Sequence, residues 1–177
     1  VQYDDLIQAE SDLLQVIEDL NNHMRSVFEK EFHKLNEYFA DAFKALFGGG
    51  EASLVIQDES DVLESGIDII AQPPGKKLQH LSLLSGGEKA LTAIAILFAM
   101  LKHRPSPFCL LDEIEAALDE ANLNHFAKYV KDYSRNTQFV IITHRRGTME
   151  SCDRLYGVTM EEKGVSKMIS VKISDYE

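Results

Sequence analysis

The chain has 177 residues, of which 45% are apolar and 27% are charged, and its 18 basic against 29 acidic side chains give a formal net charge of −11. This length and apolar content suffice for one substantial buried core, so they exclude a wholly disordered chain. The acidity argues against a protein that coats nucleic acid generally, although it leaves room for one local basic patch.

The sequence also argues against export and against a membrane partner. No apolar run approaches the roughly 20 residues that cross a bilayer, so no membrane span is predicted. The chain opens on acidic residues where a signal peptide would be basic, and without an initiator Met, so we expect a segment cut from a longer protein. Cys109 and Cys152 are too few for a disulfide framework or a zinc cluster, which fits a reducing cytoplasm.

The first 47 residues contain no Gly and no Pro and carry one apolar stripe. Ten apolar residues from Leu13 to Leu46 follow one another in nine steps over 33 positions, an average of about 3.67, which is a helical period. The spacing predicts one helix from about residue 3 to residue 47, on the order of 65 Å long. We expect its Leu/Ile-rich start to project like a coiled-coil seam and its Phe-rich end, from Phe28 onward, to join the core. A plain core helix is the alternative.

Shorter elements follow this helix. Gly48-Gly49-Gly50 favours a helix end and a turn. From residue 85 onward helices alternate with apolar strands, which predicts an α/β fold with a mixed sheet flanked by helices. The expected helices cover Gly86–Lys102, Glu120–Tyr133 and Thr148–Cys152; the expected strands are Ser53–Ile56, Ile67–Ala71, Phe108–Leu111 and Gln138–Ile142, with a final hairpin-like pair of Leu155–Met160 and Val165–Ile173.

A Gly-Gly pair stands at the start of the helix predicted from residue 86. Ser85, Gly86 and Gly87 present a hydroxyl and unobstructed backbone N–H groups, and the helix dipole has its positive end at the same point. Anionic phosphate is the natural ligand of such an arrangement. An ordinary Ser N-cap with flexible glycines explains the segment about as well.

Two adjacent carboxylates, Asp112 and Glu113, follow the strand over Phe108–Leu111. Ligands gather at the carboxyl ends of strands in an open α/β sheet. Asp112 is suited to Mg²⁺, which uses few carboxylates and keeps several waters. Glu113 is suited to orient and deprotonate a water that attacks a terminal phosphate. A strand that simply ends in polar surface residues is the plain alternative.

Two further polar positions complete the pattern. Asp119 precedes the helix over Glu120–Tyr133 and is suited to cap it. Thr143-His144 follows the second buried strand, and a His beside the acidic pair is suited to contact a γ-phosphate, although a lone His is more often structural. Each signal is ambiguous alone, but their order and spacing together are not.

Taken together, these segments resemble the motifs of ABC-type ATPases. Leu84–Glu88 looks like the signature motif, Leu110–Glu113 like the Walker B strand, Ala117–Asp119 like the D-loop and Thr143-His144 like the switch histidine. Within that superfamily the run from Asp112 to Asn122 resembles the SMC (structural maintenance of chromosomes) version, because Ile114-Glu115 stand where transporter subunits usually carry Pro-Thr. The tail, Gly157–Met160 and Gly164–Lys167, is similar to the ending of bacterial SMC proteins.

The resemblance covers the whole chain and implies the C-terminal lobe of an SMC head. Residues 1–47 would be the end of the coiled coil and the helix that enters the head, and residues 48–177 would be the lobe. No segment matches Gly-x-x-x-x-Gly-Lys-Ser/Thr, the phosphate-cradling P-loop, which in this family lies in the N-terminal half of the polypeptide. ATP and Mg²⁺ should therefore need the N-terminal lobe, and the chain alone should be inactive.

The resemblance also assigns each motif to one of two nucleotides. The first belongs to the same head and the second to an opposing head that engages it. The implied residues are the metal ligand Asp112 and the catalytic pair Glu113 and His144 for the first nucleotide, and Ser85, Gly86, Gly87 and Glu88 for the second, with Asp119 at the joint between them.

The implied function is an ATPase of chromosome condensation and segregation, associated with the nucleoid in the cytoplasm. Its partners would be the N-terminal lobe, a second head, DNA, and the C-terminal winged-helix domain of a kleisin docked on the final strands. A RecN-like DNA-repair ATPase and a purely kleisin-binding module are the alternatives. Lys76-Lys77 and Arg145-Arg146, the only paired basic residues, suit solvated surface charge at least as well as DNA contact.

Overall fold

A computed structural model of the chain describes residues 2–172. The helices are α1 (Gln2–Phe47), α2 (Gly86–His103), α3 (Glu120–Tyr133) and α4 (Arg146–Glu150), with 3-10 turns at Glu59–Asp61 and Leu81–Leu83. The strands are β1 (Glu51–Ile56), β2 (Ile67–Gln72), β3 (Gln79–His80), β4 (Phe108–Asp112), β5 (Gln138–Ile142), β6 (Arg154–Glu162) and β7 (Val165–Lys172).

The α/β class and the order of the elements agree with the sequence prediction. The described strands are divided among three sheets: an antiparallel sheet of β1, β2 and β3, a parallel pair of β4 and β5, and an antiparallel hairpin of β6 and β7. The helix predicted over Thr148–Cys152 instead runs from Arg146 to Glu150, because the chain after it closes a turn in which the N–H of Cys152 donates to Met149 O. Ile173, predicted to end the last strand, lies outside the described residues.

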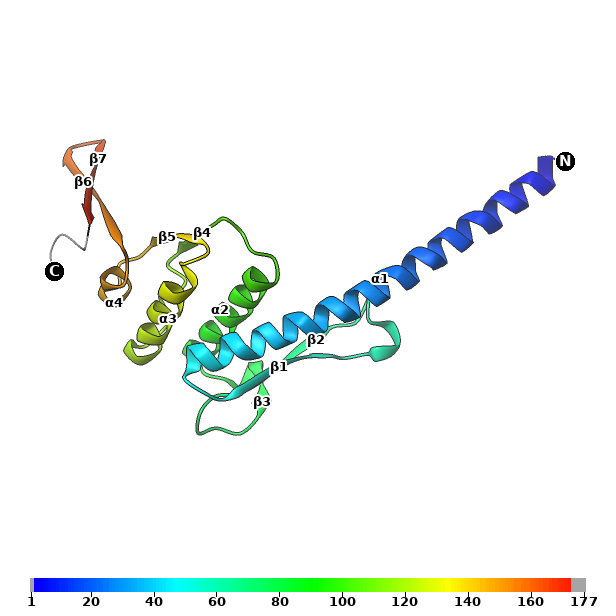
Figure 1. Cartoon of the computed structure of the whole chain (residues 1–177), viewed down its shortest axis with the longest axis horizontal. Helices are drawn as coiled ribbons and strands as arrows, with labels where there is room; N and C mark the ends of the chain where they lie inside the picture. The colour runs from blue at the N-terminus through cyan, green and yellow to red at the C-terminus, as the bar shows by residue number, and fades with distance from the viewer. Residues whose placement is uncertain (1, 173–177) are drawn as a thin grey trace.

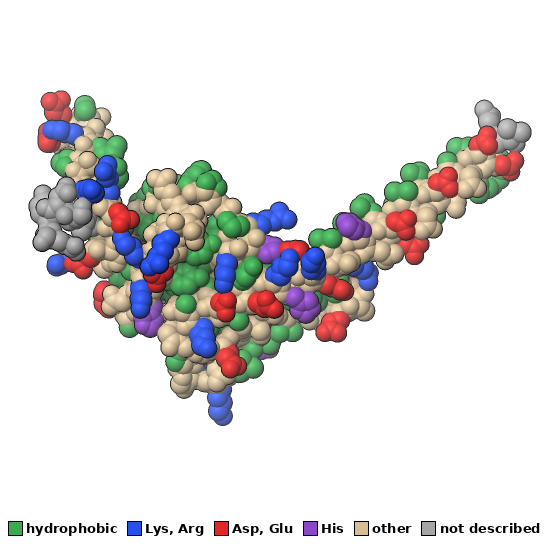
Figure 2. Space-filling model, viewed as in Figure 1, with side chains coloured by type: hydrophobic (Ala, Val, Ile, Leu, Met, Phe, Trp, Pro, Cys, Tyr) green, Lys and Arg blue, Asp and Glu red, His purple; other side chains and the backbone are tan. Residues whose placement is uncertain are grey.

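Helix α1 extends far beyond the rest of the lobe (Figure 1). Between Tyr3 and Val27 this helix carries large apolar side chains that are exposed to solvent. Figure 2 shows apolar and acidic side chains interspersed along the projecting part. Further along, Phe39, Phe43 and Leu46 have no exposed surface. The expectation that the Leu/Ile-rich start projects and the Phe-rich end joins the core is therefore confirmed.

The core is built where the last turns of α1 pack on α2 and α3. Phe98 of α2 is fully buried, and its ring centroid lies 4.9 Å from that of Tyr129, 6.5 Å from that of Phe126 and 5.9 Å from that of Phe139. Burial raises the pKa of Tyr129 to about 12. Burying one such ring contributes about 1.5–3 kcal/mol, so this cluster fixes α2 against α3 and β5.

The parallel pair positions the polar residues that follow it. Phe108 pairs with Gln138 and Asp112 pairs with Ile142, so β4 and β5 end at the same edge. One face of the pair packs on the core, whereas the other exposes four apolar side chains, Phe108, Leu110, Val140 and Ile142. Within residues 2–172 nothing covers that outer face enough to bury it.

The hairpin of β6 and β7 projects from the end of the body opposite to α1 (Figure 1). Every described residue of β7 is exposed. Tyr156, Val158 and Met168 alternate onto one face of the ribbon, where Val158 pairs with Met168 across the strands. An apolar ribbon this exposed marks a surface for interaction.

Two expectations from composition concern the cysteines and the membrane. Cys109 and Cys152 are free thiols and partly buried, and burial raises the pKa of each. None of the helices in the described part of the chain is long and apolar enough to span a bilayer.

Candidate active site

The backbone turns sharply where β4 ends. Glu113 has a φ of +46°, the left-handed region that side chains other than glycine seldom adopt. Its N–H donates to the carbonyl of Ile142 at 3.0 Å, which extends the pairing of β4 with β5 by one residue before the chain reverses. A residue held in this region costs about 1–3 kcal/mol and is typical of functional sites.

Three of the predicted site residues lie at this edge. His144, two residues after β5, donates from Nδ1 toward Glu113 Oε1 at a distance of 3.3 Å. Both side chains are more than half exposed, and Asp112 beside them is exposed as well. The carboxylate of Asp112 has no hydrogen-bond or ion-pair partner elsewhere in residues 2–172, although its backbone pairs with Ile142 in the sheet. The parallel register thus brings together groups that are 31 positions apart in the sequence.

The side chains at this edge can bind Mg²⁺ only together with ligands from another molecule. No group of three or more His, Cys, Asp and Glu side chains in the described part of the chain is arranged to hold a metal ion alone. Asp112 nevertheless offers a free, exposed carboxylate, and Mg²⁺ is commonly bound through one or two carboxylates together with waters and phosphate oxygens. The residues present therefore fit Mg²⁺ bound with a nucleotide.

A buried polar contact lies beneath this edge, and the sequence analysis missed it. Glu115 has no exposed surface, and its Oε1 accepts hydrogen bonds from the hydroxyls of Thr143 at 2.5 Å and Thr148 at 3.2 Å. The same Thr143 hydroxyl oxygen accepts from the N–H of Arg145 at 2.9 Å. Nothing in the local sequence distinguishes Glu115 from the exposed acidic residues around it.

Ser85 and Glu88 cap the N-terminus of α2 by hydrogen bonds that each side chain makes to the other residue. The Ser85 hydroxyl accepts from the N–H of Glu88 at 3.4 Å, and Glu88 Oε2 accepts from the Ser85 N–H at 3.0 Å and from its hydroxyl at 2.8 Å. This is a capping box, so the N-cap interpretation of Ser85 describes the geometry. The carboxylate of Glu88, predicted to contact a nucleotide, is engaged within the cap.

Lys76 belongs to the same cluster. Its Nζ lies 2.9 Å from Glu88 Oε1, and this contact, together with the bonds from Ser85, holds the pKa of Glu88 below its usual value. The sequence analysis treated Lys76-Lys77 as a solvated basic spot. Lys76 is instead ion-paired at the signature-like segment, because the turn over residues 73–75 carries it back to α2.

The signature-like and D-loop-like segments touch each other. A Cβ added to Gly87 would lie 3.2 Å from the carbonyl oxygen of Ala117, whereas one added to Gly86 would meet nothing within 4 Å. Asp119 caps α3 by accepting from the N–H of Asn122 at 2.8 Å. Gly87 therefore permits close approach of two loops, and Gly86 presents an open backbone to solvent.

Arg145 ties the turn after β5 to the start of α3. Its Nη2 donates to the carbonyl of Leu118 at 3.0 Å and to Glu120 at 3.2 Å. Arg146 pairs with Glu150 within α4 at 2.7 Å. Arg145 is thus engaged by its own chain, which weakens its interpretation as a DNA contact, whereas the side chain of Arg146 stays 91% exposed in its surface pair.

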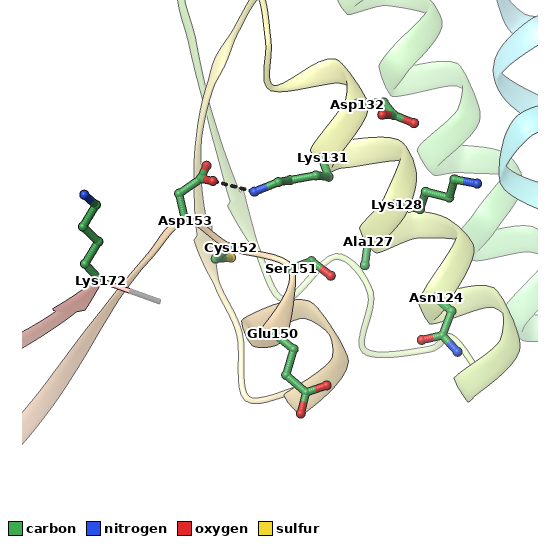
Figure 3. A pocket seen from close by; sticks show the side chains of 10 residues that line it. All are labelled: Asn124, Ala127, Lys128, Lys131, Asp132, Glu150, Ser151, Cys152, Asp153 and Lys172. Carbon is green, nitrogen blue, oxygen red and sulfur yellow. Dashed lines mark hydrogen bonds and ion pairs between the residues drawn. The ribbon is translucent and has the colours of Figure 1, made fainter. Parts of the chain in front are cut away.

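An open cavity of about 500 Å³ lies away from these residues, between α3, α4 and the base of the β6–β7 hairpin (Figure 3). Lys131 crosses it to Asp153 at 2.5 Å. None of the predicted site residues lines this cavity. The candidate site is therefore the exposed edge described above.

The fold that carries this edge and the capped start of α2 matches that of solved SMC heads. The family model described as RecF/RecN/SMC N terminal domain matches residues 6–167. A solved structure from work on ATP-driven dimerization and DNA-stimulated activation of SMC ATPases is 39% identical, with a TM-score of 0.79 over 85% of this chain and 91% of that one. The chain belongs to the SMC branch of the RecF/RecN/SMC family.

Two other comparisons bear on the whole protein. The Chromosome partition protein Smc of Bacillus subtilis (strain 168) is 59% identical over 174 residues, which are 98% of this chain and 15% of that protein. The structure of an SMC head bound to the C-winged helix domain of ScpA is 40% identical, with a TM-score of 0.77 over 85% of this chain and 46% of that one. The chain thus spans about 15% of the length of this curated relative.

Proposed function

We propose that the chain is the C-terminal lobe of an SMC ATPase head that condenses and segregates a bacterial chromosome in the nucleoid, within the cytoplasm. The observation that carries this proposal is the edge formed by Asp112, Glu113 and His144, with Glu113 and His144 3.3 Å apart. Residues 1–47 lead in from a coiled coil and residues 48–177 form the lobe. This division stays a prediction.

The N-terminal lobe of the same head is the first partner. Phe108, Leu110, Val140 and Ile142 leave an apolar sheet face open to solvent, and covering such a face is favourable by roughly 25 cal/mol per Å². The P-loop that this sequence lacks would then bring its ATP to the edge beside Asp112 and Glu113. The proposal therefore requires a site that two lobes build together.

The chemistry assigned to this edge is hydrolysis of the γ-phosphate. Glu113 accepts a proton from the attacking water, and the hydrogen bond from His144 holds its carboxylate in a fixed orientation. Asp112 would hold Mg²⁺, which when bound would supply positive charge to neutralise the phosphate oxygens. The basis for Glu113 as the base is that its carboxylate is exposed and has a single partner, whereas Glu115 is buried.

A second head is the partner of the signature-like segment. Helix α2 is 18 residues long, and its capped start exposes Ser85 and Gly86. A γ-phosphate held by an opposing head would meet the N–H groups and the positive end of the helix there. Asp119 and the D-loop-like segment, which contact Gly87 through Ala117, would lie at the joint between the two sites.

The kleisin and DNA are proposed for the complete protein. A kleisin winged-helix domain is assigned to the exposed β6–β7 hairpin, because a similar head was solved with the C-winged helix domain of ScpA. Since Lys76, Arg145 and Arg146 are ion-paired within the chain, DNA contact is not assigned to them. A RecN-like repair ATPase is less well supported, because the similar curated proteins are Smc proteins.

The proposal is tested by measuring ATP hydrolysis for the purified chain alone and after addition of the P-loop lobe. The chain alone should hydrolyse no ATP above background, and the two lobes together should show turnover that Glu113→Gln lowers about 10²–10⁴-fold. Turnover by the chain alone, after exclusion of contaminants, would contradict the two-lobe site. Winged-helix binding without any turnover by the two lobes would favour the interaction module.

A further inference from the structure

Glu115 is the most deeply buried carboxylate described, and it is only partly satisfied. Its side chain has no exposed surface, its Oε1 accepts two hydroxyl donors, and its Oε2 has no hydrogen-bond partner. It forms no ion pair with any described residue. Leaving a buried polar atom unpaired costs about 1–3 kcal/mol, so an apolar side chain of similar volume would serve the packing of this lobe better.

The two hydroxyls come from the chain segment that carries His144. Thr143 precedes His144 and lies at the exit of β5, and Thr148 lies in α4, so Oε1 holds both sides of this turn. The Thr143 hydroxyl has one proton, which it donates to Glu115, and it receives the Arg145 N–H on its oxygen. The bond from the Arg145 N–H spans His144, and the bond to Glu115 ties this turn to the segment that follows β4.

A second hydrogen bond, at the surface, joins the segment that carries Glu115 to the turn that carries His144. Glu115 follows Glu113 by two residues, and His144 Nδ1 reaches Glu113 at 3.3 Å. The bond from Thr143 to the buried Glu115 and the exposed bond from His144 to Glu113 therefore run side by side between the same two segments. The exposed bond is open to water and weak on its own, whereas the bond to Glu115 is partly shielded from water.

We infer that Glu115 is a positioning residue for hydrolysis: by holding Thr143 it sets His144 against Glu113 before the nucleotide arrives. The inference rests on the proposed function, in which Glu113 is the base. Neither Glu115 nor Thr143 touches the nucleotide in this arrangement. Their loss should therefore slow the chemical step and leave ATP affinity unchanged.

The test uses Thr143→Val in the complete head, with Thr137→Val as the matched control. Both threonines are substituted by an isostere that lacks the hydroxyl; Thr143 is partly buried and Thr137 is buried, but the Thr137 hydroxyl donates to Ser106 O, away from the site. Thr143→Val should lower kcat about 10- to 100-fold with the KM for ATP changed less than about threefold, because small displacements of catalytic groups cost this much. Thr143→Ser should restore most of kcat, and Thr137→Val should not lower it.

A second variant guards against a simple folding defect. Glu115→Leu removes the bonds from both Thr143 and Thr148, so it should lower kcat at least as much as Thr143→Val does. The double variant should be no slower than Glu115→Leu, because the bond from Thr143 is already lost in that variant. Normal kcat in Thr143→Val, a raised KM with kcat retained, or additive losses would each overturn the inference. A wild-type head without turnover, or a Glu113→Gln head as fast as wild type, would overturn the proposed function and the inference with it.

Discussion

Among single residues, Ser85 and Asp119 each have two roles. Each caps a helix through its side-chain oxygen, and each also stands where an SMC head is proposed to meet the opposing nucleotide or the joint. These tasks are compatible for Ser85, because its cap uses the N–H of Glu88 and leaves the N–H groups of Gly86 and Gly87 free of the capping box. The N-cap and phosphate-site interpretations of this segment are therefore not exclusive.

The ion pair beside this cap makes a pH-dependent prediction. The lowered pKa of Glu88, caused first by Lys76, means that its stabilising effect is present above the ordinary value of 4.5 and is lost as pH falls through the lowered pKa. Lys76→Met should raise the pKa of Glu88 and lower the thermal stability at pH 7. The difference in stability from wild type should disappear toward pH 3.

NMR titration of the Glu88 carboxyl, with thermal unfolding at both pH values, measures this effect. Lys77→Met is the matched control, because Lys77 is exposed and makes no ion pair with any described residue. An unchanged Glu88 pKa in Lys76→Met would show that the cap alone, without Lys76, sets the ionisation of this carboxyl.

The sequence predicted the neighbours at the exposed edge but not the layer beneath it. Asp112 ends one apolar strand and Thr143 follows the next, and parallel strands of this kind end at a common edge, so their proximity could be inferred. The open outer face of these two strands could not be inferred, because the sequence pattern predicted them as buried. The burial of Glu115 depends on Thr148, which α4 brings in from 33 positions away. Neither composition nor period carries that information. The same holds for Lys76, whose partner Glu88 lies beyond strand β3 and the 3-10 turn over Leu81–Leu83.

At the scale of secondary structure, helices and strands with a strong hydrophobic periodicity were predicted well. Helix α3 and strand β5 have the predicted bounds, and α1 begins within one residue of the prediction. Strand β3 was missed because two residues are too few to show alternation. The mixed sheet was expected from alternating elements, but the number of strands that join one sheet depends on edges that a partner lobe would pair. Sequence period does not reveal those edges.

The hairpin carries a prediction about the kleisin at the same scale. Met168→Glu introduces a charge on the face that holds Tyr156 and Val158, and burying an unpaired charge in an interface is strongly unfavourable. Winged-helix binding should therefore fall at least about tenfold, while ATP turnover of the complete head is retained. Lys163→Glu, in the turn between β6 and β7, is the control and should bind normally.

Calorimetry with the isolated winged-helix domain measures both affinities. Equal binding by a folded Met168→Glu chain would move the kleisin site to α1, the other long exposed apolar surface of the lobe. The same variant with Glu113→Gln added should bind no worse, because docking on the hairpin needs no nucleotide.

Three surfaces remain open at the scale of the whole molecule. These are the outer face of the β4–β5 pair, the projecting part of α1 and the hairpin at the other end (Figure 1). Helix α1 and the hairpin extend from opposite ends of the body, so partners bound to them would not displace each other. Under the proposed function, the outer face of the β4–β5 pair would take the N-terminal lobe, and the exposed start of α2 would be left for a second head.

Engagement of two heads gives the prediction that separates the two halves of the site. In a complete head, Ser85→Arg should leave ATP binding nearly intact, because the proposed contact is with the opposing nucleotide, but its bulk at the start of α2 should block engagement. Glu113→Gln should do the reverse, since the amide keeps the shape of the side chain but takes no proton from water, so ATP-bound dimers should accumulate. Light scattering with saturating ATP should find Glu113→Gln as a dimer and Ser85→Arg as a monomer. Since Ser85→Arg also loses a cap worth about 0.5–2 kcal/mol, its ATP affinity serves as the check on folding. The same oligomeric state for both ATP-bound variants would mean that the phosphate is not met from opposite sides.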